Sequence, residues 1–198
     1  PVEGGKTWRH MSQPVHIWWF PKKVLWEDEL DGRYSSASGT EVREVVFLSR
    51  HSAASGRPSL TLHVIGVPGE SPVGESAEYG GIKGAVVPPN QRFASWFRRM
   101  VQAAHDHAVV DEFDLTIETT HHGPSLSAPT MFIEIGSTES HWGRTDAAEV
   151  WADVIFEGLG LDGGPGLGDW DALSDSERAQ SKVMLGIGGG HYAPRHTD

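Results

Sequence analysis

The sequence of 198 residues contains no cysteine, which excludes a disulfide scaffold, thiolate catalysis and any zinc site built on Cys. A metal ion would have to be held by carboxylates and by some of the 11 His residues. No run of 18 apolar residues is present, so we expect no membrane-spanning segment. No signal-peptide pattern is present either, so we expect a cytoplasmic protein. Basic residues are few: 16 Lys and Arg stand against 27 Asp and Glu. The resulting net charge of −11 argues against nucleic-acid binding through a basic surface.

The composition that remains, 38% hydrophobic and 22% charged, is typical of a soluble globular protein. The length predicts a single domain over residues 1–198, large enough for a sizeable core. The chain begins at Pro1 rather than Met, and it ends at Asp198 shortly after a Gly-rich stretch. We therefore expect a fragment that is truncated at both ends.

Hydrophobic periodicity predicts strands interleaved with helices. Apolar and alternating runs predict strands at residues 15–20, 44–49, 60–67, 113–118, 130–136 and 183–187. Apolar residues at helical spacing predict helices over 93–104, with Asn90 as N-cap, and over 147–155. Ser174 and Glu177 have the spacing of a capping box, whereas polar residues 27–41 are typical of a loop. This order of elements predicts an α/β fold, a mixed sheet flanked by helices.

Histidines and a carboxylate gather at the ends of these predicted strands. His51, His121, His122 and His191 each follow a strand, and Glu134 lies near the end of another. Ligands of open α/β sheets bind at the carboxyl ends of the strands. Imidazole and carboxylate groups are natural Zn²⁺ ligands and also acid–base catalysts. The pattern therefore indicates a metal site or an acid–base centre.

Simpler interpretations exist for several of these residues. His121-His122-Gly123-Pro124 also fits a plain turn, and Glu134 a surface position at a strand end. His63, inside a predicted strand, is more typical of a hydrogen-bonded core imidazole than of a ligand. The run Gly186–His191 lacks the third Gly of a dinucleotide fingerprint and the Lys of a P-loop. Its glycines instead favour close approach of backbone N–H groups to a substrate. Trp18-Trp19-Phe20 fits a buried strand or a stacking platform for bases.

Five motifs in the same order carry a resemblance to a known family. They are LSRHS at 48–52, PSLTLH at 58–63, THHGP at 120–124, FIEIGSTE at 132–139 with Trp142, and GIGGGHYAPR at 186–195. Together they resemble the archaeal and plant type of D-aminoacyl-tRNA deacylase. The similarity runs from about residue 15 to the end of the chain.

The resemblance implies a phosphorylase/hydrolase-like three-layer sandwich and hydrolysis of the ester between a D-amino acid and the tRNA 3′ end. This reaction is a chiral proofreading step that recycles tRNA and feeds D-amino acid catabolism. The resemblance also implies zinc, and zinc activates water for attack on an ester. We expect the metal ligands among His51, His63, His121, His122, Glu134 and His191. All of these except His63 are also predicted catalytic residues.

Residues near these ligands are the candidates for substrate binding. They are Arg50, Ser52, Gly123, Pro124, Gly188, Gly189, Gly190 and Arg195. The glycine amides, with Arg50 or Arg195, would contact the oxyanion or the terminal adenosine. We expect a monomer whose partner is D-aminoacyl-tRNA, and neither DNA nor a membrane. Two alternatives remain, a metal-dependent hydrolase or peptidase of a small substrate and a non-catalytic RNA-binding remnant.

The distribution of charge bears on the tRNA expectation. Residues 139–177 hold 10 acidic residues and a single base, Arg144, so the rest of the chain is nearly neutral. The excess negative charge is therefore concentrated in one segment. We expect tRNA to avoid that segment rather than the whole protein.

Overall fold

A computed structural model of the protein describes residues 2–70, 80–188 and 190–197. The chain forms two compact units, which are described separately below. Unit 1 comprises Pro1–Val46, Val64–Asn90 and Thr120–Met131, and unit 2 comprises Phe47–His63, Gln91–Thr119 and Phe132–Asp198. The predicted α/β class with a mixed sheet is confirmed. Among the described residues, no helix is long and apolar enough to cross a membrane.

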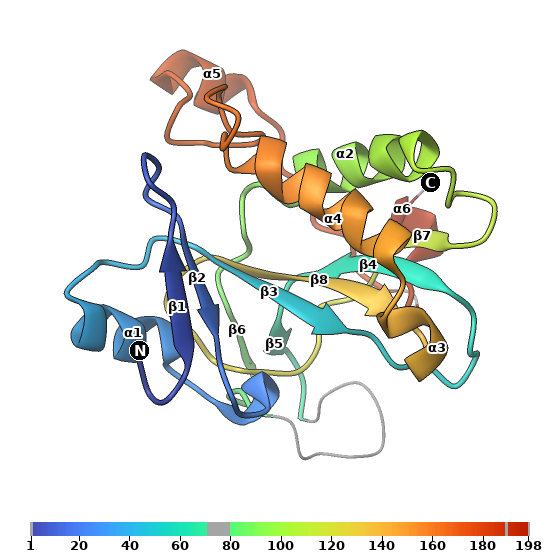
Figure 1. The fold of residues 1–198 in the computed structure, drawn as a ribbon, viewed down its shortest axis with the longest axis horizontal. Coiled ribbons are helices and arrows are strands. Elements are labelled where there is room, and N and C mark those ends of the chain that lie inside the picture. Colours follow the sequence, from blue (N-terminus) through green and yellow to red (C-terminus); the bar gives the residue numbers. More distant parts are fainter. Residues whose placement is uncertain (1, 71–79, 189, 198) are drawn as a thin grey trace. The chain divides into compact units, whose positions relative to one another are not determined.

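A four-stranded sheet lies mostly within unit 2 (Figure 1). Its strands, in spatial order, are β3 (Val45–Arg50), β8 (Thr130–Gly136), β4 (Ser59–His63) and β7 (Asp114–Ile117). β4 is parallel to β7 and antiparallel to β8, which makes the sheet mixed. All five residues of β4 are buried, because β4 is an inner strand.

The two faces of this sheet differ in chemistry because successive side chains of a strand alternate between faces. One face carries Thr61 and His63 of β4, and Thr61 is paired in register with Glu134 of β8. The other face carries Leu60 and Leu62, which are completely buried. Burial of each such Leu contributes about 1.5–3 kcal/mol to folding. The alternation therefore produces one apolar face, which packs in the core, and one polar face.

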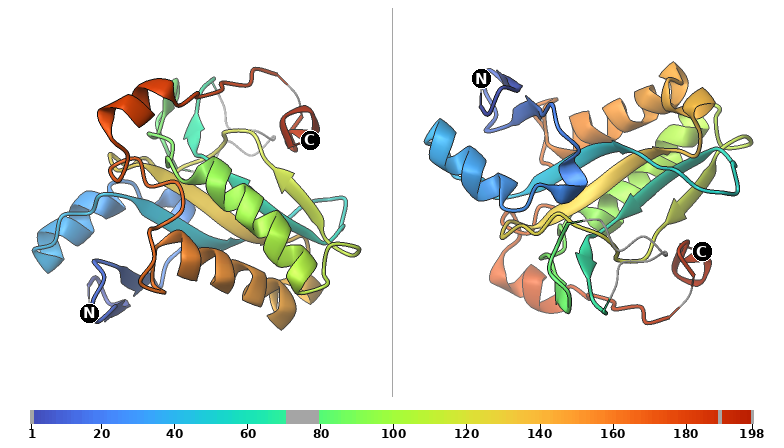
Figure 2. Two further views of the ribbon diagram at one scale, coloured as in Figure 1. Left: turned by 90° about the horizontal axis from the view of Figure 1, so that it is seen from above. Right: turned by 90° about the horizontal axis from the view of Figure 1, so that it is seen from below.

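Two helices of unit 2 lie side by side over the sheet (Figure 2). They are α2 (Phe93–Asp106) and α4 (Thr145–Gly158), and both were predicted from periodicity. The side chain of Trp96 on α2 is completely buried, and a Cβ atom at Gly158 on α4 would lie 2.4 Å from its indole ring. Glycine at position 158 thus allows the two helices to approach closely.

The C-terminal part of unit 2 contains short helices, α3 (Glu139–Trp142), α5 (Asp175–Gln180) and α6 (Pro194–Thr197). The capping box at Ser174 and Glu177 is confirmed, and it begins α5. The strand predicted at 183–187 is wrong. These residues have no regular structure, and the side chain of Ile187 is 87% exposed. An apolar run becomes a strand only when a neighbouring strand accepts its backbone hydrogen bonds.

The described residues of unit 1 form two antiparallel strand pairs and one regular helix. β1 (Lys6–Arg9) pairs with β2 (His16–Trp19), and β5 (Gly66–Val67) pairs with β6 (Ala85–Val86). Along the chain, β2 is followed by the 3-10 helix η1 (Val24–Trp26) and by α1 (Leu30–Ser38).

Three expectations for this unit were wrong in detail. The segment predicted as a loop, residues 27–41, contains α1, because Leu30 and Tyr34 are buried and Asp31 accepts hydrogen bonds from two distant amides. The run predicted as one strand at 60–67 is interrupted between His63 and Gly66. The N-cap of α2 is Arg92 and not Asn90. The Asn90 side chain instead donates to Glu44 Oε2 at 3.2 Å.

Candidate active site

The polar face of the unit 2 sheet collects the side chains that sequence reasoning had placed at strand ends. His51 directly follows β3, and Glu134 lies within β8. Glu118 directly follows β7, where its amide continues the ladder to Leu62 O at 2.9 Å. His191 comes from the segment before α6, which is held beside β7 because Thr119 N donates to His191 O at 2.9 Å. Three of the predicted ligands and one unpredicted carboxylate thus meet in one place.

His51 is the centre of this cluster. Its Nδ1 lies 3.1 Å from Glu118 Oε1 and 3.3 Å from Glu134 Oε2. Carboxylates only accept hydrogen bonds when ionised, so Nδ1 carries a proton and donates. Its Nε2 lies 2.7 Å from the hydroxyl of Tyr192, and the other oxygen of Glu118 lies 2.9 Å from His191 Nε2. The two carboxylates therefore fix the orientation of His51, and one of them links it to His191.

The electrostatics of the cluster follow from burial and from these contacts. Burial of the His51 ring opposes protonation, but the hydrogen bond with Glu134 and the charge of Glu118 outweigh it and raise the pKa of His51. Burial alone would raise the pKa of Glu134, whereas the contacts with His51 and His63 hold that pKa below its usual range. Glu134 thus stays ionised inside the protein. Burial raises the pKa of the Tyr192 hydroxyl, which remains protonated at neutral pH.

The backbone around His51 is held by close packing. The indole Nε1 of Trp142 donates to His51 O at 2.8 Å. Gly136 lies against the imidazole, and a Cβ atom there would be 2.8 Å from His51 Cβ and Cδ2. The guanidinium of Arg50, an exposed side chain, lies over the Trp142 ring at 4.7 Å. Trp142 therefore anchors the His51 loop and also positions a cation next to it.

His63 extends the cluster into the core. Its side chain is fully buried, it stacks on Phe132 with ring centroids 5.2 Å apart, and its Nε2 lies 3.9 Å from Glu134 Oε2. The stacking agrees with the simpler expectation of a core imidazole. Its role as a ligand stays a prediction.

His121 and His122 belong to unit 1. His121 forms a parallel bridge with Ile65, and the two imidazole rings lie 4.4 Å apart. His122 has a positive φ of 47°, and its Nδ1 donates to Gly123 O at 2.6 Å. This bond fixes the tautomer in which Nε2 carries the lone pair, the form a metal ligand or a base requires. A side chain at Gly123 would overlap the backbone of Gly80, so glycine at position 123 is required for close packing in unit 1.

The predicted substrate-binding residues differ in how well they are held. Gly188, with φ of 95°, and Gly190 are exposed, and so are Ser52 and Arg195, the latter on α6. Gly189 lies outside the described residues. The prediction that His191 follows a strand was wrong, because residues 183–187 are irregular. Substrate binding by all of these residues stays a prediction.

Two residues of the cluster were missed from the sequence, Glu118 and Tyr192. Glu118 had a signal, because Asp114, Thr116 and Glu118 alternate with apolar residues and so share one face of β7 and its continuation. Tyr192 stands next to His191 but has no periodicity. Its position became evident only from the pairing of the C-terminal segment with Glu118.

The donor set fits a zinc ion. Within unit 2, two overlapping groups each offer three ligand atoms within 4.8 Å of one another: His51, Glu118 and His191, and His63, Glu118 and Glu134. Zinc binds nitrogen and oxygen ligands of these types, with three protein ligands in catalytic sites. Two buried carboxylates so close together also repel each other unless positive charge lies between them. The cluster therefore has the composition and the charge of a cation site.

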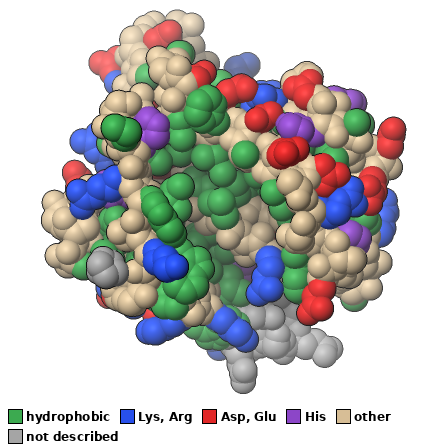
Figure 3. Space-filling view, viewed as in Figure 1, with side chains coloured by type: hydrophobic (Ala, Val, Ile, Leu, Met, Phe, Trp, Pro, Cys, Tyr) green, Lys and Arg blue, Asp and Glu red, His purple; other side chains and the backbone are tan. Residues whose placement is uncertain are grey.

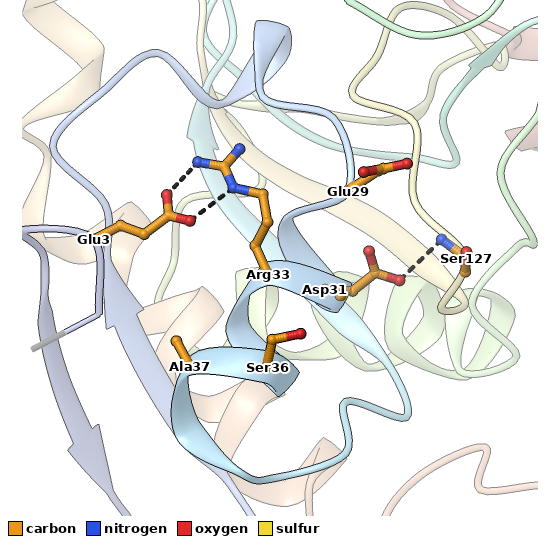
Figure 4. A pocket seen from close by; sticks show the side chains of 8 residues that line it. Glu3, Glu29, Asp31, Arg33, Ser36, Ala37 and Ser127 are labelled. Atoms are coloured by element: carbon orange, nitrogen blue, oxygen red, sulfur yellow. Dashed lines mark hydrogen bonds and ion pairs between the residues drawn. The ribbon is translucent and has the colours of Figure 1, made fainter.

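Unit 1 contains an open pocket of about 690 Å³ that includes none of the predicted site residues (Figure 4). It is lined by Glu3, Glu29, Asp31, Gly32, Arg33, Ser36, Ala37 and Ser127. Three of its charged groups are engaged in contacts: Arg33 pairs with Glu3, and Asp31 accepts from the Ser127 amide at 2.9 Å. These contacts hold α1 in place.

Comparisons with known proteins agree with the resemblance. The sequence model of the D-aminoacyl-tRNA deacylase family matches residues 38–198. A D-aminoacyl-tRNA deacylase of Arabidopsis thaliana is 51% identical over 177 residues, which is 89% of this chain and 54% of that protein. One from Archaeoglobus fulgidus is 31% identical and aligns with 96% of this chain and 59% of its own length. One from Pyrococcus furiosus is 36% identical, with 89% and 56% covered.

A solved structure has the same fold. It is a crystal structure of a conserved protein of unknown function, with a TM-score of 0.79 and 30% sequence identity. The match covers 100% of this chain and 61% of that one. The chain thus spans about half to three-fifths of the length of the relatives that it matches.

Proposed function

Because the chain belongs to the D-aminoacyl-tRNA deacylase family, we propose that it contributes the active site for hydrolysis of D-aminoacyl-tRNA. In this reaction water adds across the ester bond, which releases the free D-amino acid and restores the hydroxyl at the tRNA 3′ end. The observation that carries the proposal is the cluster of buried His51, Glu118 and Glu134 with partly exposed His191 on the polar face of the sheet.

The roles of these residues follow from their contacts. Glu134 accepts a hydrogen bond from Nδ1–H of His51, so it orients the ring and directs Nε2 towards the Tyr192 hydroxyl. A carboxylate that fixes a His tautomer in this way is common both in metal sites and in catalytic triads. Arg50 lies over Trp142 next to His51, where its positive charge suits the terminal phosphate or the oxyanion of the tetrahedral intermediate.

We include zinc in this proposal. His51, Glu118 and His191 would hold the ion. His191 is about one-third exposed, so this group is open to substrate on one side. The alternative group of His63, Glu118 and Glu134 is buried throughout. A bound zinc ion would supply the Lewis acidity that makes water a nucleophile near neutral pH. Glu134 and His63 would then support the ligands from behind. The ligand role of His121 and His122 is a separate part of the prediction made from the sequence.

The choice of D over L substrate is proposed to come from steric exclusion rather than from attraction to the D form. Recycling of tRNA, a cytoplasmic location and a monomeric state are expected to accompany this function.

The test is to measure deacylation of D- and L-aminoacyl-tRNA together with zinc content. We expect D-selective release by the unchanged protein, and loss of both activity and bound zinc in His51→Ala and Glu118→Gln. His105→Ala, which removes an exposed imidazole of α2, is the matched control and should leave both unchanged. His122→Ala should abolish deacylation while leaving the fold intact. Undiminished activity in His51→Ala would overturn the assignment, and full activity in metal-free protein would overturn the zinc part alone.

A further inference from the structure

The strand pair of unit 1 exposes an aromatic face that none of the site chemistry uses. In the register of β1 and β2, Lys6 lies opposite Trp19 and Trp8 lies opposite Ile17. Alternation puts these four side chains on one face, here named the outer face of the hairpin. Trp8, Ile17 and Trp19 are 52%, 63% and 53% exposed. A contiguous exposed patch of two Trp and one Ile is unusual for a protein surface without a binding role.

The opposite, inner face of the same strands packs against other residues of unit 1. Trp18 lies 5.1 Å from Tyr34 of α1 and 5.0 Å from Phe20, measured between ring centroids, and its Nε1 donates to Val2 O at 3.2 Å. His16 Nδ1 lies 2.9 Å from the Tyr34 hydroxyl. The inner face therefore already binds the strands to unit 1. These contacts do not involve the outer face.

Cations accompany the exposed rings. Lys6 Nζ lies 6.0 Å from the ring centroid of Trp19, and Lys23 Nζ lies 5.5 Å from that of Trp26. Figure 3 shows Lys and Arg side chains next to hydrophobic ones over the region of β1 and β2. Lys6 forms no ion pair with any carboxylate that the structure describes. Its positive charge is thus available to a partner of the outer face.

The charge of this region is opposite to that of the chain. Residues 1–26 contain four bases, Lys6, Arg9, Lys22 and Lys23, and one acid, Glu3, whereas the whole chain carries −11. Two carboxylates of the acidic run that follows bind backbone amides. Asp28 accepts from the amides of Gly81 and Ser125, and Asp31 accepts from those of Ser127 and Ala128. Lys6 is the charged residue among the four that make up the outer face, so this face carries a positive charge.

We propose that the outer face of the hairpin binds single-stranded RNA, with bases stacked on Trp8 and Trp19 and a phosphate near Lys6. Exposed aromatic rings combined with cations are the composition by which proteins hold unpaired nucleotides. The centre of a protein–protein interface is instead depleted of Lys. A duplex does not fit, because its bases are already stacked on one another. Identification of the RNA as the tRNA substrate rests on the proposed function, but the binding itself does not.

The experiment is fluorescence anisotropy with labelled eight-nucleotide oligo(U) and oligo(A), and with an RNA duplex of equal length. We expect the single strands to bind and the duplex to bind much more weakly. Trp8→Ala and Trp19→Ala should each weaken binding by about fivefold or more, the fold-change that stacking of one base represents. Lys6→Ala should reduce the slope of log K against log salt by about 0.7.

Matched controls separate this effect from general changes. Phe156→Ala removes an aromatic side chain of α4 that is 50% exposed, and Lys182→Ala removes an exposed Lys of unit 2. Both should bind oligonucleotides as the unchanged protein does. Thermal unfolding of the Trp variants should remain cooperative, because about half of each side chain removed is exposed and neither lies in the core.

Two results would overturn the proposal. One is unchanged oligonucleotide binding by the double variant Trp8→Ala/Trp19→Ala. The other is self-association in sedimentation velocity that the double variant abolishes, because it would assign the face to a second copy of the chain. Failure of the proposed function is recognised separately. His51→Ala should lose deacylation and keep oligonucleotide binding, whereas the double Trp variant should raise KM for tRNA without changing kcat.

Discussion

The replacement Gly136→Ala tests whether the position of His51 controls activity. The added methyl group would lie 2.8 Å from two carbon atoms of His51 and 2.8 Å from Ser59 Oγ. Carbon atoms in contact are normally at least about 3.5 Å apart, so the imidazole has to move by roughly 0.7 Å. The φ angle of Gly136 is not positive, so alanine fits the backbone and the effect is purely steric.

A displacement of this size is large for the contacts of His51. The Nδ1 atom already lies 3.3 Å from Glu134 Oε2, close to the limit of a hydrogen bond. We expect deacylation to fall by about 100-fold, the typical cost of misplacing a reacting group by about 1 Å. Overpacking should also lower the free energy of unfolding by about 1–3 kcal/mol.

The assay is single-turnover release of D-amino acid from D-aminoacyl-tRNA, together with urea unfolding. Gly143→Ala is the matched control, since a Cβ at this nearby glycine meets no atom within 4 Å. It should behave as the unchanged protein in both measurements. A Gly136→Ala variant with unchanged deacylation, or an equal loss in both variants, would refute the reasoning.

Three further predictions concern stability. Gly158→Ala puts a methyl group 2.4 Å from the buried Trp96 indole, and it should lower the free energy of unfolding by about 1–3 kcal/mol in a urea titration. Asp31→Asn removes the charge that binds the amides of Ser127 and Ala128, and it should lower the free energy of unfolding by about 1–3 kcal/mol. Glu29→Gln, which changes an exposed carboxylate nearby, should leave the free energy of unfolding unchanged. In metal-free protein the ionised Glu134, with its lowered pKa, stabilises the folded state. This contribution is complete above the ordinary carboxyl pKa of about 4.3, and it is lost as the pH falls through the lowered pKa. Glu134→Gln should therefore make the free energy of unfolding fall less steeply as the pH is lowered. Glu149→Gln is the surface control. An identical steepness in Glu134→Gln and the unchanged protein would contradict this.

The sequence by itself determined the α/β class, the two long helices and most of the sheet strands. These features depend on hydrophobic periodicity, which is a property of neighbouring residues. The motifs around His51 and His191 likewise identified the family. The sequence also placed Glu134 in an apolar strand, but the register that puts Glu134 beside Thr61 came from the structure.

Only the tertiary structure decided which distant residues meet. Glu118 contacts both His51 and His191 because the C-terminal segment pairs beside β7, and no local pattern encodes that pairing. Tertiary contacts also made a helix of residues 30–38, through the amides that bind Asp31, and left 183–187 without a partner strand. The net charge of −11 gave no indication of the basic aromatic face of β1 and β2. That face exists because strand register brings Lys6, Trp8, Ile17 and Trp19 together while the neighbouring carboxylates bind the protein's own amides.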